Sequence, residues 1–401
     1  MYWNQEPAAR FGQPTFGEVQ NQKKCLVTEH PNGAPPRAHP GQAPQSPRCA
    51  RLANCGLRSL RRNLREWGCL KAIEICVIQG LSISYGLRDG SLVRAVDGLS
   101  LTISGGEVVG VLGESGCGKS TLAAAILRLL SPHARYEEGL VLLRGRDLLS
   151  MRESELSKIR GREISLVPQD PALALNPVMS AGSQISEVMR AHLPLSAKER
   201  RARVLELLSD VGFDSPKQIY GAYPHQLSGG ERQRVVIAQA ISCMPSLLIA
   251  DEPTSKLDAP KQAEILALLA RIRDETQLAL MLISHDPAIF AGFADRIAVM
   301  YAGRIVEAGT TPQIFQRPLH PYSEALVQIA KSTVATSLSA GRTLFPAIEG
   351  ESPDPSNPPS GCRFHPRCSE AFAMCPREKP SLLEVAPGHY VECLLYEGDR
   401  T

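Results

Sequence analysis

The chain has 401 residues, of which 43% are hydrophobic and 21% are charged, so it has material for about two or three folded domains. Its 44 Lys and Arg side chains nearly balance its 41 Asp and Glu side chains, and a net charge of +3 gives no argument for nucleic-acid binding. No run of about 18 apolar residues occurs, and residues 1–10 lack the basic and apolar stretches of a secretory signal. We therefore expect neither a membrane-spanning helix nor a cleaved leader.

Residues 1–71 differ in composition from the rest of the chain. Six prolines fall within residues 31–48, and five arginines follow between Arg51 and Arg65. Prolines at this density sustain neither helix nor sheet, so the segment is predicted to be a disordered extension. A basic anchor for lipid headgroups or for a protein partner is the alternative.

From residue 72 onward, short apolar strands alternate with helical stretches. The strands are predicted at Val108–Leu112, Ile164–Val167, Leu247–Ala250 and Leu278–Ile283. Between the last two, residues 263–272 place their apolar side chains on one stripe of a helix. This alternation is typical of an α/β sheet covered on both faces.

Strands outside this alternation are also predicted. Leu81–Ser84 and Leu99–Ile103 indicate a smaller β layer ahead of the main sheet. Ile297–Met300 and Arg304–Glu307 indicate a hairpin. From residue 342 the chain is Pro-rich again and contains four cysteines, and we expect a small appendix there that contributes no strand to a sheet.

A glycine-rich segment follows the strand Val108–Leu112 and precedes an apolar helix at Leu122–Leu130. It fits the pattern G-x-x-x-x-G-K-[ST] and comprises Gly113, Glu114, Ser115, Gly116, Cys117, Gly118, Lys119, Ser120 and Thr121. Its backbone N–H groups can curve around phosphates, Lys119 adds a positive charge, and the Ser120 hydroxyl can ligate Mg²⁺. Cys117 stands at a variable position of the pattern, where no thiol chemistry is needed. The segment predicts nucleotide binding.

Two acidic residues end the strand Leu247–Ala250. Asp251 lies where a carboxylate beside a phosphate loop can hold the Mg²⁺ shell. Glu252 follows it and can polarise a water molecule for attack on a γ-phosphate. The pair extends the prediction from nucleotide binding to nucleotide hydrolysis.

A third motif, Leu227–Arg234, opens a helix before that strand. Ser228, Gly229 and Gly230 offer a hydroxyl and bare N–H groups at a helix N-terminus, which is a second anion site. This motif resembles the signature of ABC-transporter ATPases. The resemblance implies an α/β fold: a P-loop NTPase core of the ABC-ATPase type with an antiparallel β layer, a helical signature subdomain and a small C-terminal Cys-containing extension.

The other motifs of that family follow in order, so the resemblance covers residues 72–395. Tyr85 resembles the aromatic residue that stacks on adenine, and Gln169 resembles the Q-loop glutamine. Asp258 ends a segment similar to the D-loop, and His285 resembles the switch histidine. Lys256 departs from the small residue common in the D-loop, which affects the contact expected there between two subunits.

The resemblance implies a role for each acidic and polar residue. Glu252 is the general base, Ser120 and Asp251 hold Mg²⁺, Gln169 contacts metal and water, and His285 reaches the γ-phosphate. It also implies a head-to-tail dimer of ATPase subunits. Each ATP then lies between the phosphate loop of one subunit and the signature of the other.

The C-terminal part narrows the family. The stretches Arg317–Leu326 and Gly361–Cys368 resemble the extension of oligopeptide and dipeptide importer ATPases, whose relatives import nickel. Asp170–Pro177 is also similar to that group. The implied domains are an ABC ATPase at 72–315 with its helical subdomain at about 170–240, and an extension at 316–401 with a four-Cys segment at 362–393.

The resemblance implies an ATP-hydrolysing subunit of a peptide importer at the cytoplasmic face of the inner membrane. Its partners would be a second ATPase subunit, favoured to be a paralogue, two membrane permeases and a substrate-binding protein, with no nucleic acid. Nickel import is the alternative within the family. A soluble ABC ATPase acting on nucleic acid or ribosomes is the alternative from another class, but such proteins usually carry two cassettes or a coiled coil.

Four of the eleven cysteines fall in the Pro-rich tail, with the spacing C-x₅-C-x₆-C-x₁₇-C: Cys362, Cys368, Cys375 and Cys393. So small a segment needs a staple, and four thiolates can hold either Zn²⁺ or a [4Fe–4S] cluster. The family resemblance implies the cluster, and free thiols are the third alternative. His365 and His389 are expected to be surface residues rather than ligands.

Overall fold

The computed structural model describes residues 73–86, 91–338 and 348–398, and residues 333–338 by their backbone only. The described residues belong to one compact unit. The segment 1–71, which the sequence predicts to be disordered, lies entirely outside the described residues. All statements below concern the described part of the chain.

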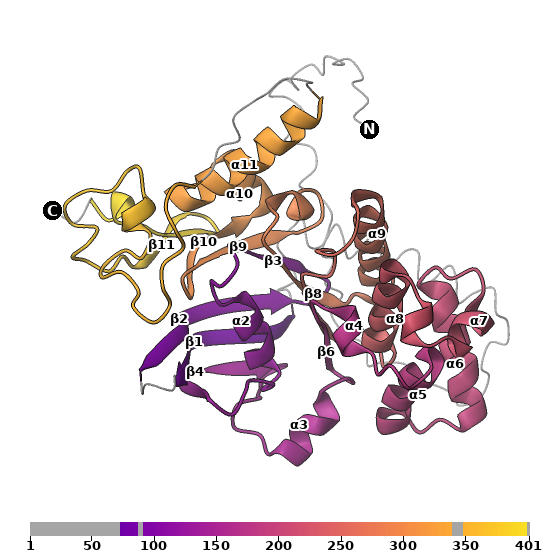
Figure 1. Cartoon of the computed structure of the whole chain (residues 1–401). Helices are drawn as coiled ribbons and strands as arrows, with labels where there is room; N and C mark the ends of the chain where they lie inside the picture. Colours follow the sequence, from indigo (N-terminus) through magenta and orange to yellow (C-terminus); the bar gives the residue numbers. More distant parts are fainter. Residues whose placement is uncertain (1–72, 87–90, 339–347, 399–401) are drawn as a thin grey trace, which may run out of the picture. The chain divides into compact units, whose positions relative to one another are not determined.

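A four-stranded antiparallel sheet forms one layer of the described structure, with strand order β2-β1-β4-β5 (Figure 1). Its strands are β1 (Glu74–Gly86), β2 (Leu92–Ser104), β4 (Ala134–Leu143) and β5 (Arg146–Asp147). The predicted β layer is confirmed. Its first two strands are longer than predicted because pairing between β1 and β2 continues through several register shifts.

The second layer is an eight-stranded sheet of order β11-β12-β10-β9-β3-β8-β7-β6. Its strands are β3 (Val108–Leu112), β6 (Ile164–Val167), β7 (Leu247–Asp251), β8 (Ala279–Ser284), β9 (Arg296–Tyr301), β10 (Arg304–Thr310), β11 (Leu382–Ala386) and β12 (His389–Glu392). Strands β6, β7, β8, β3 and β9 pair in parallel. Their carboxyl ends therefore share one edge, where the phosphate loop and the strand-end acids lie.

The prediction that the tail contributes no strand is wrong. Strands β11 and β12 form a hairpin, and β12 pairs antiparallel with β10 through Glu307 opposite Val391 and Ala308 opposite Tyr390. The two-residue turn uses Gly388, whose φ is +69°. Most of β11 is exposed, so the tail lacks the apolar alternation that signals a strand in a sequence.

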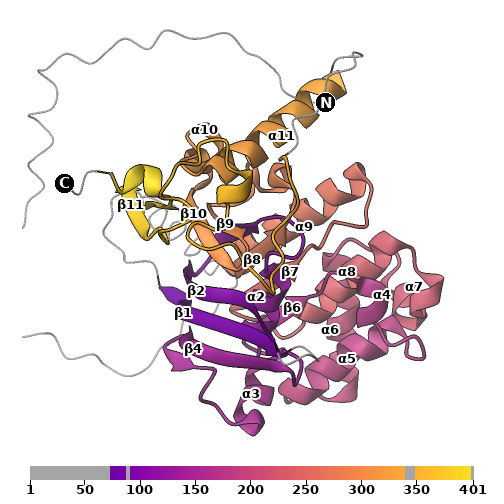
Figure 2. The same ribbon diagram turned by 60° about the vertical axis from the view of Figure 1, so that its left-hand side comes forward.

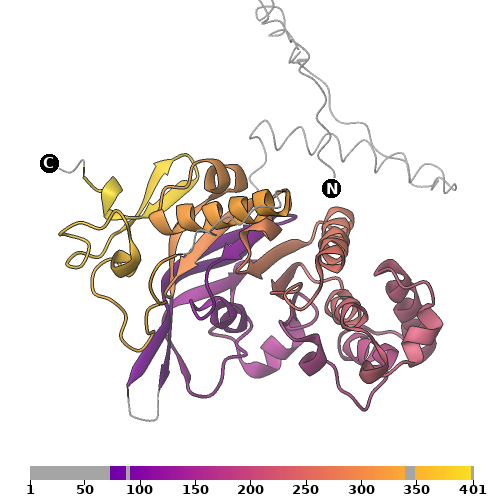
Figure 3. The ribbon, with the colours of Figure 1, turned by 45° about the horizontal axis from the view of Figure 1, so that its top comes forward.

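Helices cover the sheets and form a separate cluster. They are α2 (Lys119–Ile126), α3 (Glu153–Ile159), α4 (Pro171–Ala174), α5 (Ala181–His192), α6 (Ala197–Asp210), α7 (Pro216–Gly221), α8 (Gly229–Ile241), α9 (Ala259–Thr276), α10 (Thr311–Gln316) and α11 (Pro321–Leu338). Helices α5, α6 and α7 pack on one another, and α8 contacts this group. Figure 2 shows this group beside the β6 end of the eight-stranded sheet, away from the hairpin β11–β12 that forms the opposite edge, and Figure 3 agrees.

Helix α2 is buried between the two sheets, and this placement positions the phosphate loop. Leu122 and Ile126 of α2 are fully buried in a cluster with Ile83 of β1 and Val111 of β3. Burial of such aliphatic side chains contributes about 1.5–3 kcal/mol each. The loop between β3 and α2 is thus held at both ends by packed core.

Candidate nucleotide-binding site

The phosphate loop connects Leu112 of β3 to Lys119 of α2. A Cβ atom at Gly113 would lie 2.2 Å from the carbonyl oxygen of Met300. Gly118 has φ of +106°, and a Cβ there would lie 2.2 Å from the carbonyl oxygen of Ala95. Only glycine fits at either position, so the neighbouring strands β9 and β2 fix the curvature of the loop.

Lys119 lies inside this loop rather than in solvent. Its side chain is buried, and its Nζ donates hydrogen bonds to the carbonyl oxygens of Gly113 (2.7 Å) and Glu114 (2.8 Å). The ammonium group therefore has no carboxylate partner among these contacts and is available to an anion entering the loop. This is the arrangement that phosphate binding needs.

A second group suits a divalent cation. Asp251 ends β7, is 7% exposed, and its Oδ1 atom is buried with no hydrogen-bond partner. Burial raises the pKa of Asp251, and the charge of Glu252 adds to this, against the hydrogen bond from Ser120 and the charge of Lys119. An unpaired carboxylate oxygen next to a hydroxyl is a ligand set of the kind Mg²⁺ prefers. Asp251 and Ser120 therefore fit the cation predicted for them.

The three residues predicted to be catalytic lie together. Glu252 Oε1 is 2.9 Å from His285 Nδ1, and Gln169 Nε2 donates to Glu252 Oε2 at 2.9 Å. Glu252 and His285 come directly after the parallel strands β7 and β8, and Gln169 comes two residues after the neighbouring strand β6. Glu252 also has φ of +45°, an uncommon conformation for a residue with a side chain. The strand ends thus aim one carboxylate at the space beside the phosphate loop.

Gln169, Glu252 and the phosphate loop border a pocket of about 610 Å³, a volume suited to a ligand of nucleotide size. Asp251 and His285 are not among the residues that the described structure places in its lining. Its lining includes the loop residues 114–121, Gln169 and Glu252, together with Tyr85, whose hydroxyl lies 3.4 Å from Thr121 Oγ1. Sequence reasoning missed several other lining residues: Val93, Arg94, Ala95, Tyr301, Ala302, Gly303, Ser352, Pro353, Asp354, Pro355, Pro358 and Arg363. No local pattern marks them, because they come from strand ends and from the distant tail.

The signature residues are placed elsewhere. Ser228 caps α8: its Oγ accepts a hydrogen bond from the N–H of Glu231, whose carboxylate accepts one from the N–H of Ser228. Gly229 and Gly230 begin the helix. None of these three is among the lining residues that the structure describes for the pocket. Within one chain the signature and the phosphate loop therefore do not share a ligand.

Asp258 and Lys256 of the D-loop-like segment, like the signature residues, make contacts within their own chain. Asp258 caps α9 by accepting a hydrogen bond from the N–H of Lys261 at 3.0 Å. Lys256, which departs from the family pattern, forms an ion pair with Asp170, the residue after Gln169. The hydrogen bond from Lys256 holds the pKa of Asp170 below its usual range. This ion pair links the segment after β7, which contains Glu252, to the segment after β6, which contains Gln169.

The four tail cysteines form no disulfide and lie near one another, but the described side chains are not gathered around one point. Cys362, Cys375 and Cys393 are buried, Cys368 is half-buried, and the N–H of Cys362 donates to the carbonyl of Cys375 at 2.8 Å. Burial raises the pKa of Cys362, Cys368 and Cys393, the last to about 11, and neighbouring thiols add to it. Across the described residues, no group of three or more His, Cys, Asp or Glu is placed to hold a metal ion. The metal-bound staple remains a prediction.

The expectation that His389 lies at the surface is wrong. It is 3% exposed, and its Nε2 lies 2.7 Å from Oε1 of Glu307, a fully buried carboxylate. Glu307 also accepts hydrogen bonds from the N–H groups of Leu319 and His320. A histidine in a polar tail reads as exposed in the sequence, whereas pairing of β12 with β10 buries it beside its partner.

Two family models match the chain. The model described as "ABC transporter" matches residues 96–255, and the model "Oligopeptide/dipeptide transporter, C-terminal region" matches residues 306–375. An oligopeptide transport ATP-binding protein of Bacillus subtilis is 44% identical over 315 residues, covering 78% of this chain and 94% of that protein. A dipeptide transport ATP-binding protein of the same organism is 41% identical over 325 residues, covering 81% and 95%.

A solved structure is also similar. A dimeric ATP-binding cassette in a post-hydrolysis state, bound to ADP and phosphate, has a TM-score of 0.54 at 28% identity, covering 59% of this chain and 98% of the other. The predicted fold class is thereby confirmed for the cassette. Among the helices of the described residues, none has both the length and the apolar character that crossing a bilayer requires.

Proposed function

Since this chain belongs to the ABC-transporter ATPases and, among them, to the ATP-binding proteins of oligopeptide and dipeptide transport, we propose that it hydrolyses ATP to drive peptide import through a membrane permease. The observation that carries the proposal is the convergence of Lys119, Asp251 and Glu252 at one sheet edge, in a chain that spans 94% of such a relative. The predicted peptide-import ATPase is favoured over the alternatives because the relatives are named for peptide transport.

The residues would divide the chemistry as follows. Lys119 exchanges its two carbonyl contacts for the phosphates of ATP, to which the loop N–H groups also donate. Bound Mg²⁺ would neutralise charge on the phosphates, held by Ser120 and Asp251 with Gln169 near it. Glu252 accepts the proton of the attacking water, while Gln169 and His285 hold its carboxylate in position. Tyr85 would stack on the adenine ring.

We propose a head-to-tail dimer as the working state. Ser228, Gly229 and Gly230 lie outside the pocket of their own chain, which supports a role at the nucleotide of a second ATPase subunit. Asp258 would lie near the same junction. The second subunit is proposed to be a paralogue, and the assembly to include two permeases and a substrate-binding protein at the cytoplasmic face of the membrane.

Reconstitution tests this function. The chain, its partner ATPase, the permeases and the binding protein are placed in lipid vesicles, and uptake of a labelled di- or oligopeptide is measured with MgATP. We expect uptake that stops in a Glu252→Gln variant. Uptake of Ni²⁺ without peptide would favour the nickel alternative. An ATPase rate stimulated by DNA or ribosomes, but not by the permeases, would contradict the transport function.

We also propose that the four tail cysteines carry a [4Fe–4S] cluster as a structural staple. Support comes from the placement of the four thiols in one extension, close enough that the other three add to the raised pKa of Cys393. The described side chains are not gathered at ligand distance around one point. The test is anaerobic purification with assays of iron, sulfide and absorbance near ~400 nm. Cys375→Ser should remove the iron and Cys243→Ser, outside the tail, should not. One zinc per chain would contradict the cluster, and four freely alkylated thiols would contradict any metal.

A further inference from the structure

The C-terminal extension contacts the phosphate loop at one residue, Glu114. The Tyr322 hydroxyl oxygen accepts a hydrogen bond from the N–H of Glu114 at 2.9 Å. Ser352 Oγ donates to Glu114 Oε2 at 2.9 Å, and the Arg367 guanidinium reaches both carboxylate oxygens, at 2.7 and 3.0 Å. Backbone and side chain of one loop residue are thus held by three points of the extension, each more than 200 residues away in the sequence.

The ion pair between Arg367 and Glu114 is largely shielded from solvent. The Arg367 side chain is 6% exposed and that of Glu114 is 25% exposed. Arg367 also donates to the carbonyl oxygen of Glu349 at 3.0 Å and lies over the ring of Tyr301. A two-pronged contact between a guanidinium and a carboxylate in such surroundings fixes geometry as well as charge.

The same extension forms one wall of the pocket. Ser352 and four residues of the segment 353–358, here called the strap, line it, and the four are Pro353, Asp354, Pro355 and Pro358. The strap is stiffened by its prolines and by a turn in which Asp354 Oδ1 accepts hydrogen bonds from the N–H and hydroxyl of Ser356. The pocket has a volume of about 610 Å³ with the strap in place, so the strap lines the pocket and leaves room for a ligand.

The strap faces the part of the pocket that the phosphates do not use. Loop residues 115–121 provide the phosphate-binding groups, and Gln169 and Glu252 line the pocket beside them. The remaining lining consists of Tyr85, residues 93–95, residues 301–303, Ser352, the strap and Arg363, so a nucleoside has to lie against these. Proline rings offer the apolar surface that a ribose and a base can contact.

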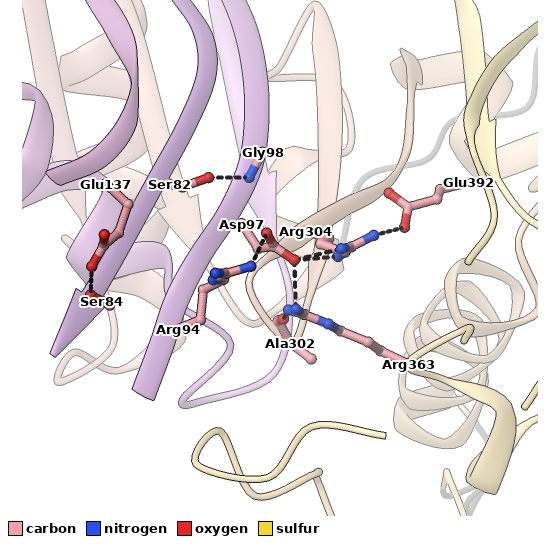
Figure 4. Close-up of polar contacts among 10 residues, drawn as sticks. All are labelled: Ser82, Ser84, Arg94, Asp97, Gly98, Glu137, Ala302, Arg304, Arg363 and Glu392. Carbon is pink, nitrogen blue, oxygen red and sulfur yellow. Dashed lines mark hydrogen bonds and ion pairs between the residues drawn. The ribbon is translucent and has the colours of Figure 1, made fainter. Parts of the chain in front are cut away.

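Buried contacts join this wall to the four-Cys segment. Arg363, next to Cys362, pairs with Asp97 of β2 at 2.6 Å, and Figure 4 shows this guanidinium beside that of Arg304 on the same carboxylate. The Phe364 ring lies 5.1 Å from Tyr301 and 5.4 Å from Tyr322. The strap, the loop contacts and the cysteines therefore belong to one packed body.

We propose that the C-terminal extension is part of the nucleotide site: the strap is the wall against the nucleoside, and Arg367, Ser352 and Tyr322 position the phosphate loop through Glu114. The inference rests on the nucleotide pocket of the proposed function and deepens it. Positioning through Glu114 should act on everything that binds the loop, whereas the strap should act only on ligands that carry a nucleoside.

The test is calorimetric titration of the full chain with two Mg²⁺-loaded probes, adenylyl-imidodiphosphate and inorganic tripolyphosphate. Arg367→Ala should weaken both probes by about tenfold. The strap variant Pro355→Gly/Pro358→Gly should weaken adenylyl-imidodiphosphate several-fold and leave tripolyphosphate unchanged. Arg377→Ala, an exposed arginine of the same extension, is the matched control and should change neither.

Milder variants keep the test decisive if Arg367→Ala does not fold. Tyr322→Phe and Ser352→Ala each remove a single contact to Glu114, and both should weaken both probes. Wild-type affinity for both probes in folded loop-contact variants would overturn the positioning role, and equal loss of both probes in the strap variant would overturn the wall. A wild-type chain that binds neither probe would instead overturn the nucleotide pocket itself.

Discussion

The phosphate loop and the C-terminal extension are held by different kinds of contact. Lys119 reaches its partners within six residues of the chain, and glycines fix the loop against adjacent strands. The extension is attached through pairs that span the sequence, such as Arg363 with Asp97 and His389 with Glu307. Local motifs thus build the phosphate loop, whereas pairs of residues far apart in the sequence attach the extension to the cassette.

Breaking the extension's attachment at Asp97 should have the largest effect. Asp97 accepts from Arg304 and Arg363, whose side chains are 9% and 10% exposed, and Arg304 also contacts Glu392 (Figure 4). Asp97→Ala leaves buried guanidinium charge without its carboxylate, at a cost of about 3–5 kcal/mol in the free energy of unfolding. Urea unfolding measures this change.

The matched control removes the exposed partner of the same carboxylate. The Arg94 side chain is 55% exposed and 3.3 Å from Asp97. Arg94→Ala should lower the free energy of unfolding by less than about 1 kcal/mol. Equal losses in the two variants would show that burial does not decide the strength of this attachment.

The next effect lies in the cassette. Glu252→Gln keeps the shape of the side chain but removes its basic carboxylate, so turnover in the assembled transporter should fall by about 10²-fold while MgATP still binds. Lys119→Ala should instead weaken binding of the nucleotide. Phosphate release and nucleotide titration separate the two outcomes. Near-normal turnover in the Glu252 variant would remove this residue as the base.

The attachment at Glu114 predicts a pH dependence. Partial burial alone would raise the pKa of Glu114, but the hydrogen bonds from Arg367 and Ser352 and nearby positive charge outweigh it and lower this pKa below its usual 4.5. The stabilisation is therefore complete above pH ~4.5 and is lost as the pH falls through the lowered pKa. Glu114→Gln should cost about 1.5 kcal/mol at neutral pH. If unfolding from pH 7 to 3 shows a constant difference from wild type, the pair does not stabilise the fold.

The smallest effect is expected at the pair of Lys256 with Asp170. Their side chains are 57% and 28% exposed, so water and salt screen the pair and Lys256→Ala should change the free energy of unfolding very little. Asp170→Ala should behave alike, beyond a small loss from its hydrogen bond to the N–H of Ala172. A large loss in thermal unfolding of either variant would mean that this contact is as important as the buried pairs.

The sequence predicted the cassette well because its signals are local. Strand β3, the loop at Gly113–Ser120 and the acids after β7 are each encoded by a few consecutive residues. The hairpin of β9 and β10 was predicted for the same reason. Parallel pairing then brings Gln169, Glu252 and His285 together, because each lies within two residues of the end of a strand of one sheet.

The extension could not be predicted in this way. Strand β11 is mostly exposed, and β12 is short, so neither shows the period of a buried strand. Arg367 and His389 stand in polar, Pro-rich sequence, and only their distant partners Glu114 and Glu307 make them buried. Such pairs depend on residues more than 80 positions apart and leave no pattern in a single sequence.

A double-mutant cycle on Glu114 and Arg367 most directly tests whether the loop and the extension form one nucleotide site. The affinity of the full chain for Mg-adenylyl-imidodiphosphate is measured in wild type, Glu114→Gln, Arg367→Ala and the double variant. Arg367→Ala should cost about tenfold in the wild-type background and almost nothing once Glu114 is replaced. The same loss in both backgrounds would show that the two residues act independently, and would contradict the coupling of the extension to the phosphate loop.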